Sequence, residues 1–149
     1  MSHMNLATAA VFHYDTLDEA WPKVDPGHEP MGSAILFQIQ RVSSRTAGGI
    51  ILAEQAKQSE ASHMQAARVV AIGPLAFKHP DTLAPWPEGA WVRVGDFLRV
   101  PKYGGFRFSV KWRHPKEKDP EEIAFVCFEP QQGCILRITG DPLLTTTYI

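Results

Sequence analysis

The sequence predicts an all-β domain, and a small antiparallel β-barrel is the most economical architecture. Three observations indicate this class: short segments in which apolar and polar residues alternate, turn-forming residues at short intervals, and almost no helical periodicity. A barrel is favoured over a sandwich because closing a sheet removes its exposed edges. With 149 residues, 44% of them hydrophobic, the chain fits one domain that can bury a core without disulfides.

The N-terminal residues 1–30 are predicted to be an extension or arm, and residues 31–149 to form the barrel domain. The extension is polar and interrupted by prolines. One short helix is expected between Thr16 and Trp21, where Thr16 and Glu19 fit a capping box. Because there is neither a secretion-signal pattern nor an apolar run of about 20 residues, we expect a cytoplasmic protein with no membrane contact.

Strands are expected wherever the apolar residues follow a period of two. The clearest alternation runs from Phe106 to Arg113, with an apolar face and a basic face. The last two predicted strands are expected to pair around a turn at Pro130–Gly133. The predicted strands are Ala34–Val42, Ala67–Ile72, Trp91–Val94, Phe97–Val100, Phe106–Arg113, Ile123–Phe128 and Cys134–Ile138.

Two long irregular segments interrupt these strands. Residues 43–63 are rich in Ser, Ala, Gln and Gly, and loops of this length tend to be functional or disordered. Inside this loop Gly48-Gly49 precede Ile50-Ile51-Leu52, a triplet that is either a binding element or a short buried strand. Residues 74–90 contain Phe77 and Trp86, for which local packing under a proline-stiffened loop is favoured over the lining of a roof.

Composition excludes several function classes. A formal net charge of −1 and a pI near 6.6 argue against a general polyanion binder. The histidines show no metal-ligand spacing, so no metal site is predicted. Cys127 and Cys134 are expected to be free thiols, although a bridge across the turn between them is geometrically possible. No nucleotide-binding loop and no catalytic triad is recognisable, which predicts a protein that is not an enzyme.

Five motifs follow one another in a fixed order. They are the loop Ser44–Leu52 with its Gly-Gly and aliphatic triplet, Ala67–Gly73, Val92–Leu98, Tyr103-Gly104-Gly105 and Cys134–Ile138. In this order they resemble the GroES family of co-chaperonins, over about Pro30 to Asp141. The resemblance implies a GroES-like β-barrel with a long mobile loop at about 43–63 and a roof loop at about 74–90.

The resemblance also implies a function: a homo-oligomeric ring, a heptamer, that caps a chaperonin in a nucleotide-dependent cycle. ATP would be bound by the chaperonin, and this chain would need no cofactor. The implied chaperonin-binding residues are Gly48, Gly49, Ile50, Ile51 and Leu52. The family pairs the first strand of one subunit with the last strand of its neighbour, which implies interface residues Ile35, Phe37, Ile39, Ile135, Leu136 and Ile138. Tyr103 would face the central opening, although an ordinary rim tyrosine fits the residues equally well.

Departures from the family pattern leave two other functions open. The extension, the segment 74–88 and the charged insert 114–122 are similar in their divergence to bacteriophage co-chaperonins, so a virion assembly or structural protein on the same barrel is one alternative. A nucleic-acid-binding β-barrel is the other, since aromatic and basic residues interleave along Phe106–Arg113. Alternation disfavours it, because aromatic and basic side chains would then point to opposite faces.

Overall fold

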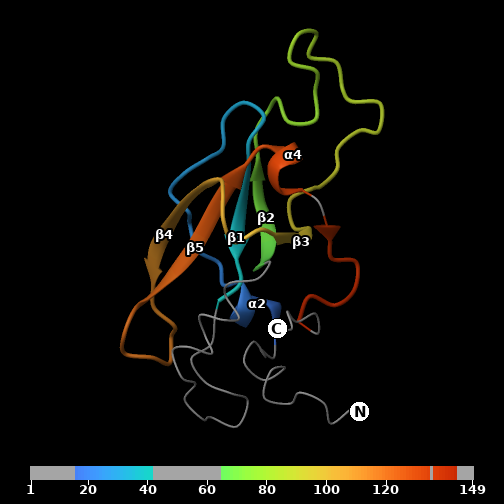
Figure 1. Cartoon of the computed structure of the whole chain (residues 1–149). Helices are drawn as coiled ribbons and strands as arrows, with labels where there is room; N and C mark the ends of the chain where they lie inside the picture. Colours follow the sequence, from blue (N-terminus) through green and yellow to red (C-terminus); the bar gives the residue numbers. More distant parts are fainter. Residues whose placement is uncertain (1–15, 42–64, 135, 144–149) are drawn as a thin grey trace.

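The computed structural model describes residues 16–41, 65–134 and 136–143, and it confirms the all-β class (Figure 1). Within these residues six strands form one antiparallel sheet in the order β4-β5-β1-β2-β3-β6, with two one-turn helices beside it. The elements are α2 (Leu17–Ala20), β1 (Ile35–Ile39), β2 (Gln65–Ile72), β3 (Phe97–Val100), β4 (Phe106–Trp112), β5 (Glu121–Phe128), α4 (Pro130–Gly133) and β6 (Leu136–Arg137).

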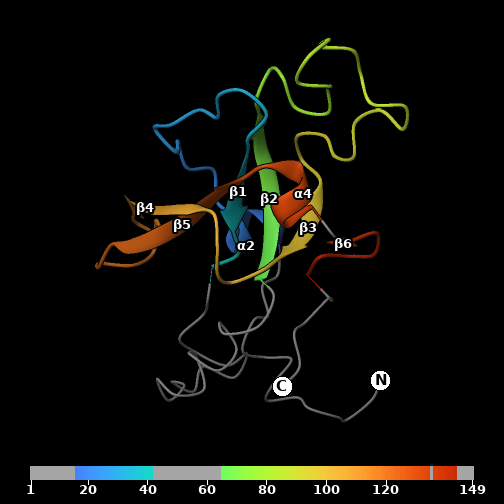
Figure 2. The ribbon, with the colours of Figure 1, turned by 45° about the horizontal axis from the view of Figure 1, so that its top comes forward.

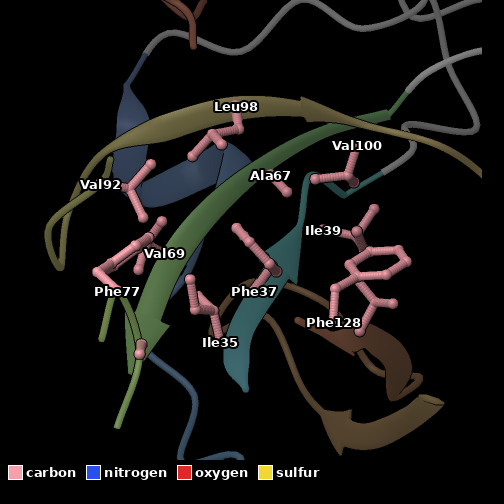
Figure 3. Close-up of a cluster of buried hydrophobic side chains, with 12 residues drawn as sticks. Ile35, Phe37, Ile39, Ala67, Val69, Phe77, Val92, Leu98, Val100 and Phe128 are labelled. Atoms are coloured by element: carbon pink, nitrogen blue, oxygen red, sulfur yellow. The ribbon is translucent and has the colours of Figure 1, made fainter. Parts of the chain in front are cut away.

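Strand β1 lies in the middle of the sheet and is buried on both faces. It pairs with β2 on one side and with β5 on the other. Ile35, Phe37 and Ile39 point into the main core, which also takes side chains from β2, β3 and β5 (Figure 3). Leu36 points the other way, into a second apolar cluster with Phe125 and other side chains of β4 and β5. Such burial on both faces explains why β1 is so apolar.

The second face of the sheet is covered by residues 16–30, the described part of the N-terminal extension and here called the arm. For these residues the expectation of an extension outside the core is wrong. Trp21 is only 1% exposed and packs edge-on against Phe97, with ring centroids 4.7 Å apart. Its indole Nε1 donates to the carbonyl of Gln38 at 3.1 Å, and the Gln38 amide donates back to the carbonyl of Pro22 at 2.8 Å. Helix α2 begins as predicted, since the Thr16 hydroxyl accepts from the Glu19 N–H at 3.2 Å. The arm is therefore a structural layer of the domain.

The connection between β2 and β3 packs its aromatic residues into the core. Phe77 is buried in the main cluster, and its ring meets those of Trp86 and Trp91 at 5.5 and 6.2 Å between centroids. The prediction of local packing is thereby confirmed. The predicted strand Trp91–Val94 is wrong, because the backbone turns there: the Arg93 N–H binds the Asp96 carboxylate at 3.0 Å.

The C-terminal strand also differs from the prediction. The segment after β5 forms helix α4, in which the Cys134 N–H donates to the carbonyl of Pro130 at 2.9 Å. This turn carries the chain across the end of the sheet, so β6 pairs with β3 and not with β5 (Figure 2). The sheet curls around the main core, and within the described residues no ladder joins its outer strands β4 and β6. Arg107 of β4 instead donates to the side chain of Gln65 on β2 and to the carbonyl of Pro101, which follows β3.

Gly73 marks a point where two backbones touch. Any Cβ there would overlap the carbonyl oxygens of Gly32 and Ala34. We expect Gly73→Ala to lower the free energy of unfolding by about 2 kcal/mol, since the overlapped atoms are backbone and cannot rotate away. Gly140→Ala is the matched control, because a Cβ at Gly140 meets nothing within 4 Å. Urea denaturation of the two variants checks this, and equal midpoints would contradict it.

The two cysteines are free thiols, as predicted. Cys127 packs in the second apolar cluster, with Leu36 and Phe125, whereas Cys134 packs against the main core. Burial raises the pKa of Cys134 from 9.0 to about 11, and it also raises the pKa of Cys127. Both thiols therefore stay protonated at pH 8.

We expect iodoacetamide to alkylate Cys134 at least about tenfold more slowly in the folded protein than in the urea-unfolded chain, and Cys127 also more slowly, because only the thiolate reacts. Stability should also fall as pH rises from 9.0 towards about 11, since Cys134 then loses its proton only when the chain unfolds. Mass spectrometry at timed intervals measures the alkylation. Equal rates in the two states would contradict the protected environment of the thiols.

Candidate functional site

The end of the sheet from which residues 42–64 depart is the candidate site. The predicted binding residues Gly48, Gly49, Ile50, Ile51 and Leu52 lie outside the described residues. Their two points of attachment are described: β1 ends at Ile39, which pairs with Ala67 of β2, and the Gln40 N–H donates to the carbonyl of Ala66 at 2.9 Å. The segment 42–64 thus leaves and re-enters the sheet on adjacent strands.

Arg41, the last described residue before this segment, is bound from three directions. Its Nε and Nη2 donate to the two carboxylate oxygens of Glu121 at 2.7 and 3.1 Å. Its Nη1 donates to the backbone carbonyl of Glu19 at 2.8 Å and to the Glu19 carboxylate at 3.3 Å. The guanidinium also lies 4.9 Å from the centroid of the Trp112 ring. The departure point is therefore fixed to α2, β4 and β5 together.

Arg41, Glu19, Glu121 and Trp112 form a cluster, here called the Arg41 cluster. It continues into the charged insert 114–122 after β4. His114 Nε2 lies 3.2 Å from the Glu19 carboxylate, and its Nδ1 accepts from the Lys116 N–H at 3.0 Å. This arrangement implies the tautomer that carries its proton on Nε2. The side chain of Arg41 is only 9% exposed. Its ion pairs are therefore better shielded from water than ordinary surface pairs, which contribute little.

We expect Arg41→Met to lower the free energy of unfolding by about 2–3 kcal/mol, because it keeps the bulk over Trp112 but leaves two carboxylates without their cation. Arg113→Met is the control, since Arg113 is an exposed residue of the neighbouring segment. Chemical denaturation measures both variants. A loss of stability no greater than that of the control would contradict the anchoring role of Arg41.

The re-entry point is held by a second arginine. Arg107 Nη1 donates to the side-chain oxygen of Gln65 at 3.0 Å, and its Nε donates to the carbonyl of Gly104 at 3.3 Å. Partial burial lowers the pKa of the Arg107 guanidinium. An arginine therefore lies at each end of the segment 42–64 and joins segments that are distant in the sequence.

The interface residues predicted on β1 do not lie at a surface. Ile35, Phe37 and Ile39 are buried in the core of the same chain, and both edges of β1 are already paired. The predicted subunit contact through these three side chains is therefore wrong. At the other end of the chain, Leu136 is 53% exposed on β6, Ile138 packs near Trp21, and Ile135 lies outside the described residues.

Tyr103 is 75% exposed in the turn between β3 and β4. The two glycines after it have positive φ angles of 96° and 70°, a conformation that favours glycine. A Cβ at Gly105 would also come within 2.8 Å of the Cys127 carbonyl oxygen. The turn therefore needs its Gly-Gly for steric reasons, and it leaves the tyrosine in solvent.

The aromatic and basic residues of β4 separate as the alternation predicts. Phe108, Val110 and Trp112 pack on the second apolar cluster, whereas Arg107 and Lys111 are exposed. Phe106 is the exception, because it is 83% exposed. In the described ranges no three His, Cys, Asp or Glu side chains gather as metal ligands, and none of the helices described is long and apolar enough to cross a membrane.

Comparison with known proteins identifies this framework. The family model described as the chaperonin 10 kDa subunit matches residues 28–117. The chain belongs to that co-chaperonin family. It is similar to the co-chaperonin GroES of Tetragenococcus halophilus, with 34% identity over 77 residues, 52% of this chain and 73% of the relative. It is also similar to the co-chaperonin GroES of Lacticaseibacillus zeae, with 32% identity over 77 residues, 52% of this chain and 74% of the relative.

The chaperonin 10 match spans all of the segment 42–64 but begins after most of the arm. Residues 16–27, with Glu19 and Trp21, are thus an addition to the matched region of this co-chaperonin. Sequence reasoning missed that Arg41 is bound by Glu19 and Glu121. The capping box at Thr16 was the only local signal that pointed to α2, and nothing in it indicated a contact with β1 or β5.

Proposed function

We propose that this protein is a co-chaperonin that caps the folding chamber of a chaperonin, and that Gly48, Gly49, Ile50, Ile51 and Leu52 bind the chaperonin. The observation that carries the proposal is the family match, which covers the whole segment 42–64. The anchored ends of this segment support it, because both ends are held on the folded domain. The protein acts without an enzymatic reaction or a cofactor of its own, and ATP is bound by the chaperonin.

The loop chemistry suits reversible binding. Burying each of the three aliphatic side chains contributes about 1.5–3 kcal/mol. Ordering each loop residue costs roughly 1–2 kcal/mol of backbone entropy, which offsets most of that gain. A single loop therefore binds weakly. Several loops on one ring raise the avidity by roughly 10²–10⁴, and the complex can still dissociate when the chaperonin changes shape.

The ring is proposed to be a heptamer assembled through the C-terminal strand. Strand β6 is an outer strand of the sheet, paired on one side with β3. Exposed Leu136, together with Ile135 and Ile138, is the proposed contact with the neighbouring subunit. Tyr103 is proposed to face the central opening, and the cytoplasm is the proposed compartment.

Analytical ultracentrifugation tests the proposal directly. The protein is sedimented alone, with a bacterial chaperonin, and with the chaperonin and ATP. We expect a ring-sized oligomer that co-sediments with the chaperonin only in the presence of ATP. A monomer that never co-sediments would contradict the proposed function and leave the chaperonin 10 fold in another role.

A further inference from the structure

The backbone changes its hydrogen-bonding partner at the point where the segment 42–64 leaves the domain. Among the described residues, bonding to β2 ends at Gln40, whose N–H donates to the carbonyl of Ala66 at 2.9 Å. The next N–H along the chain, that of Arg41, donates to the carbonyl of Ala20 in α2 at 3.0 Å. Figure 1 shows α2 at this end of β1. The chain therefore passes from the sheet to the arm immediately before the segment begins.

The side chain of Arg41 fixes a direction as well as a position. Its two contacts with the carboxylate oxygens of Glu121 form a bidentate pair, which orients the plane of the guanidinium. The remaining terminal nitrogen donates to the backbone and the side chain of Glu19, and the Trp112 ring lies 4.9 Å from the guanidinium carbon. A lysine ammonium lacks this planar fork and would not reproduce the same contacts together.

The backbone at the re-entry point is held by the sheet. Gln65 is the first residue of β2 and pairs with Val100 of β3, and Ala66 pairs with Arg99. These are ladder pairs that the sheet forms by itself. The departure point is therefore the end of the segment 42–64 whose backbone depends on the arm.

The groups that hold Arg41 lie outside the region that matches the chaperonin 10 family. The match covers residues 28–117 and so includes Arg41, whereas Glu19 and Ala20 precede it and Glu121 follows it. Well-shielded ion pairs are weak evidence for stability, because apolar side chains of the same volume often stabilise as well or better. What they do provide here is one defined orientation for the residue before the segment.

We propose that Arg41 is a positioning residue for chaperonin binding: held by Glu19, Ala20 and Glu121, it directs the segment 42–64 away from the domain and thereby raises the affinity of each loop. This inference rests on the proposed function of that segment. A loop whose departure is fixed in advance loses less conformational freedom when it binds. In a ring the effect at each loop is multiplied over the assembly. The arm thus contributes to partner affinity without touching the partner.

Variants of the Arg41 cluster test the proposal through the affinity for a bacterial chaperonin with ATP, at a temperature where circular dichroism shows every variant folded. We expect Arg41→Met to weaken binding by at least about tenfold. Arg41→Lys should recover part of this loss, because it keeps the charge but not the fork. Glu121→Gln keeps the side-chain shape and should weaken binding by about threefold, and it serves as the test if Arg41→Met does not fold.

Hydrogen exchange of the backbone amide at position 41 gives a second readout. In the wild type this amide is bonded to the carbonyl of Ala20. We expect its exchange to be at least about tenfold faster in Arg41→Met, because the departure point then opens locally. Exchange of the amides in the middle of β1 should change only as far as global stability changes.

Gly73→Ala is the control for lost stability. It is expected to destabilise the domain to a similar degree, but Gly73 follows the end of β2 that lies opposite the segment 42–64 (Figure 1). It should bind the chaperonin within about twofold of the wild type and leave exchange at position 41 unchanged relative to β1.

The outcomes separate the two proposals. If Arg41→Met and Glu121→Gln bind as tightly as the wild type, the positioning role is wrong, while the co-chaperonin function stands. If Gly73→Ala weakens binding as much as Arg41→Met, the effect is one of stability and the positioning proposal fails. If the wild type itself does not bind any chaperonin tested, the proposed function fails first and this inference with it.

Discussion

Ile51→Asp is expected to abolish co-sedimentation with the chaperonin while leaving the protein folded. The carboxylate must be desolvated wherever the wild-type isoleucine is buried against a partner, which costs several kcal/mol. In a ring every loop carries the change, so the loss is multiplied across the assembly. Circular dichroism, the oligomeric state and chaperonin co-sedimentation are measured on one preparation.

Gln55→Asp is the matched control for Ile51→Asp, because it adds the same charge to the same loop at a polar position. It should bind nearly as well as the wild type. If Ile51→Asp instead unfolds the protein, the triplet Ile50-Ile51-Leu52 is part of the core and the binding assignment is wrong. If both variants stop binding, the loop responds to charge in general and not to the loss of an aliphatic contact.

Trp21→Ala is expected to lower the free energy of unfolding by about 3–5 kcal/mol, the usual effect of removing a fully buried tryptophan. The change removes the packing on Phe97 and the hydrogen bond to Gln38. It also uncovers β1, β2 and β3 on the face that the arm protects, where Ala66 belongs to the same cluster. Urea denaturation followed by far-ultraviolet circular dichroism measures the loss.

Two further variants make the Trp21 result specific. Trp21→Phe keeps an aromatic ring but lacks the indole N–H, so an intermediate loss is expected, with about 1 kcal/mol of it from the hydrogen bond. Phe106→Ala removes an aromatic ring that is 83% exposed and should change stability by less than about 0.5 kcal/mol. If Trp21→Ala matched Phe106→Ala, the arm would be a dispensable extension.

The elements that could be predicted are those whose signal is local. Alternation identified β1 and β4, because side chains of a strand point to opposite faces regardless of what packs there. The helix start at Thr16 was predictable from a hydrogen bond that spans three residues. Predictions failed where an element depended on a distant partner. The segment Trp91–Val94 is apolar enough for a strand, but its residues pack on Phe77 and turn towards Asp96 instead of joining the sheet.

The candidate site divides in the same way. The Gly-Gly and aliphatic triplet at 48–52 is proposed as a binding element from its residues alone, whereas the anchor at Arg41 could not be predicted from the sequence. Arg41 and Glu121 lie 80 residues apart, and Glu19 and His114 lie 95 apart. No short-range pattern relates such residues, because a charged side chain in a polar segment has the same sequence signature whether it meets water or a buried partner.

The sequence alone determined the all-β class, the glycine turn after Tyr103 and the resemblance to the co-chaperonin family. Only the tertiary structure decided that the arm covers the sheet through Trp21, that β6 pairs with β3, and that Arg41 joins α2 to β5. The physical reason is that backbone preferences and alternation act between near neighbours. Burial and ion pairing depend on which surfaces the completed fold brings together.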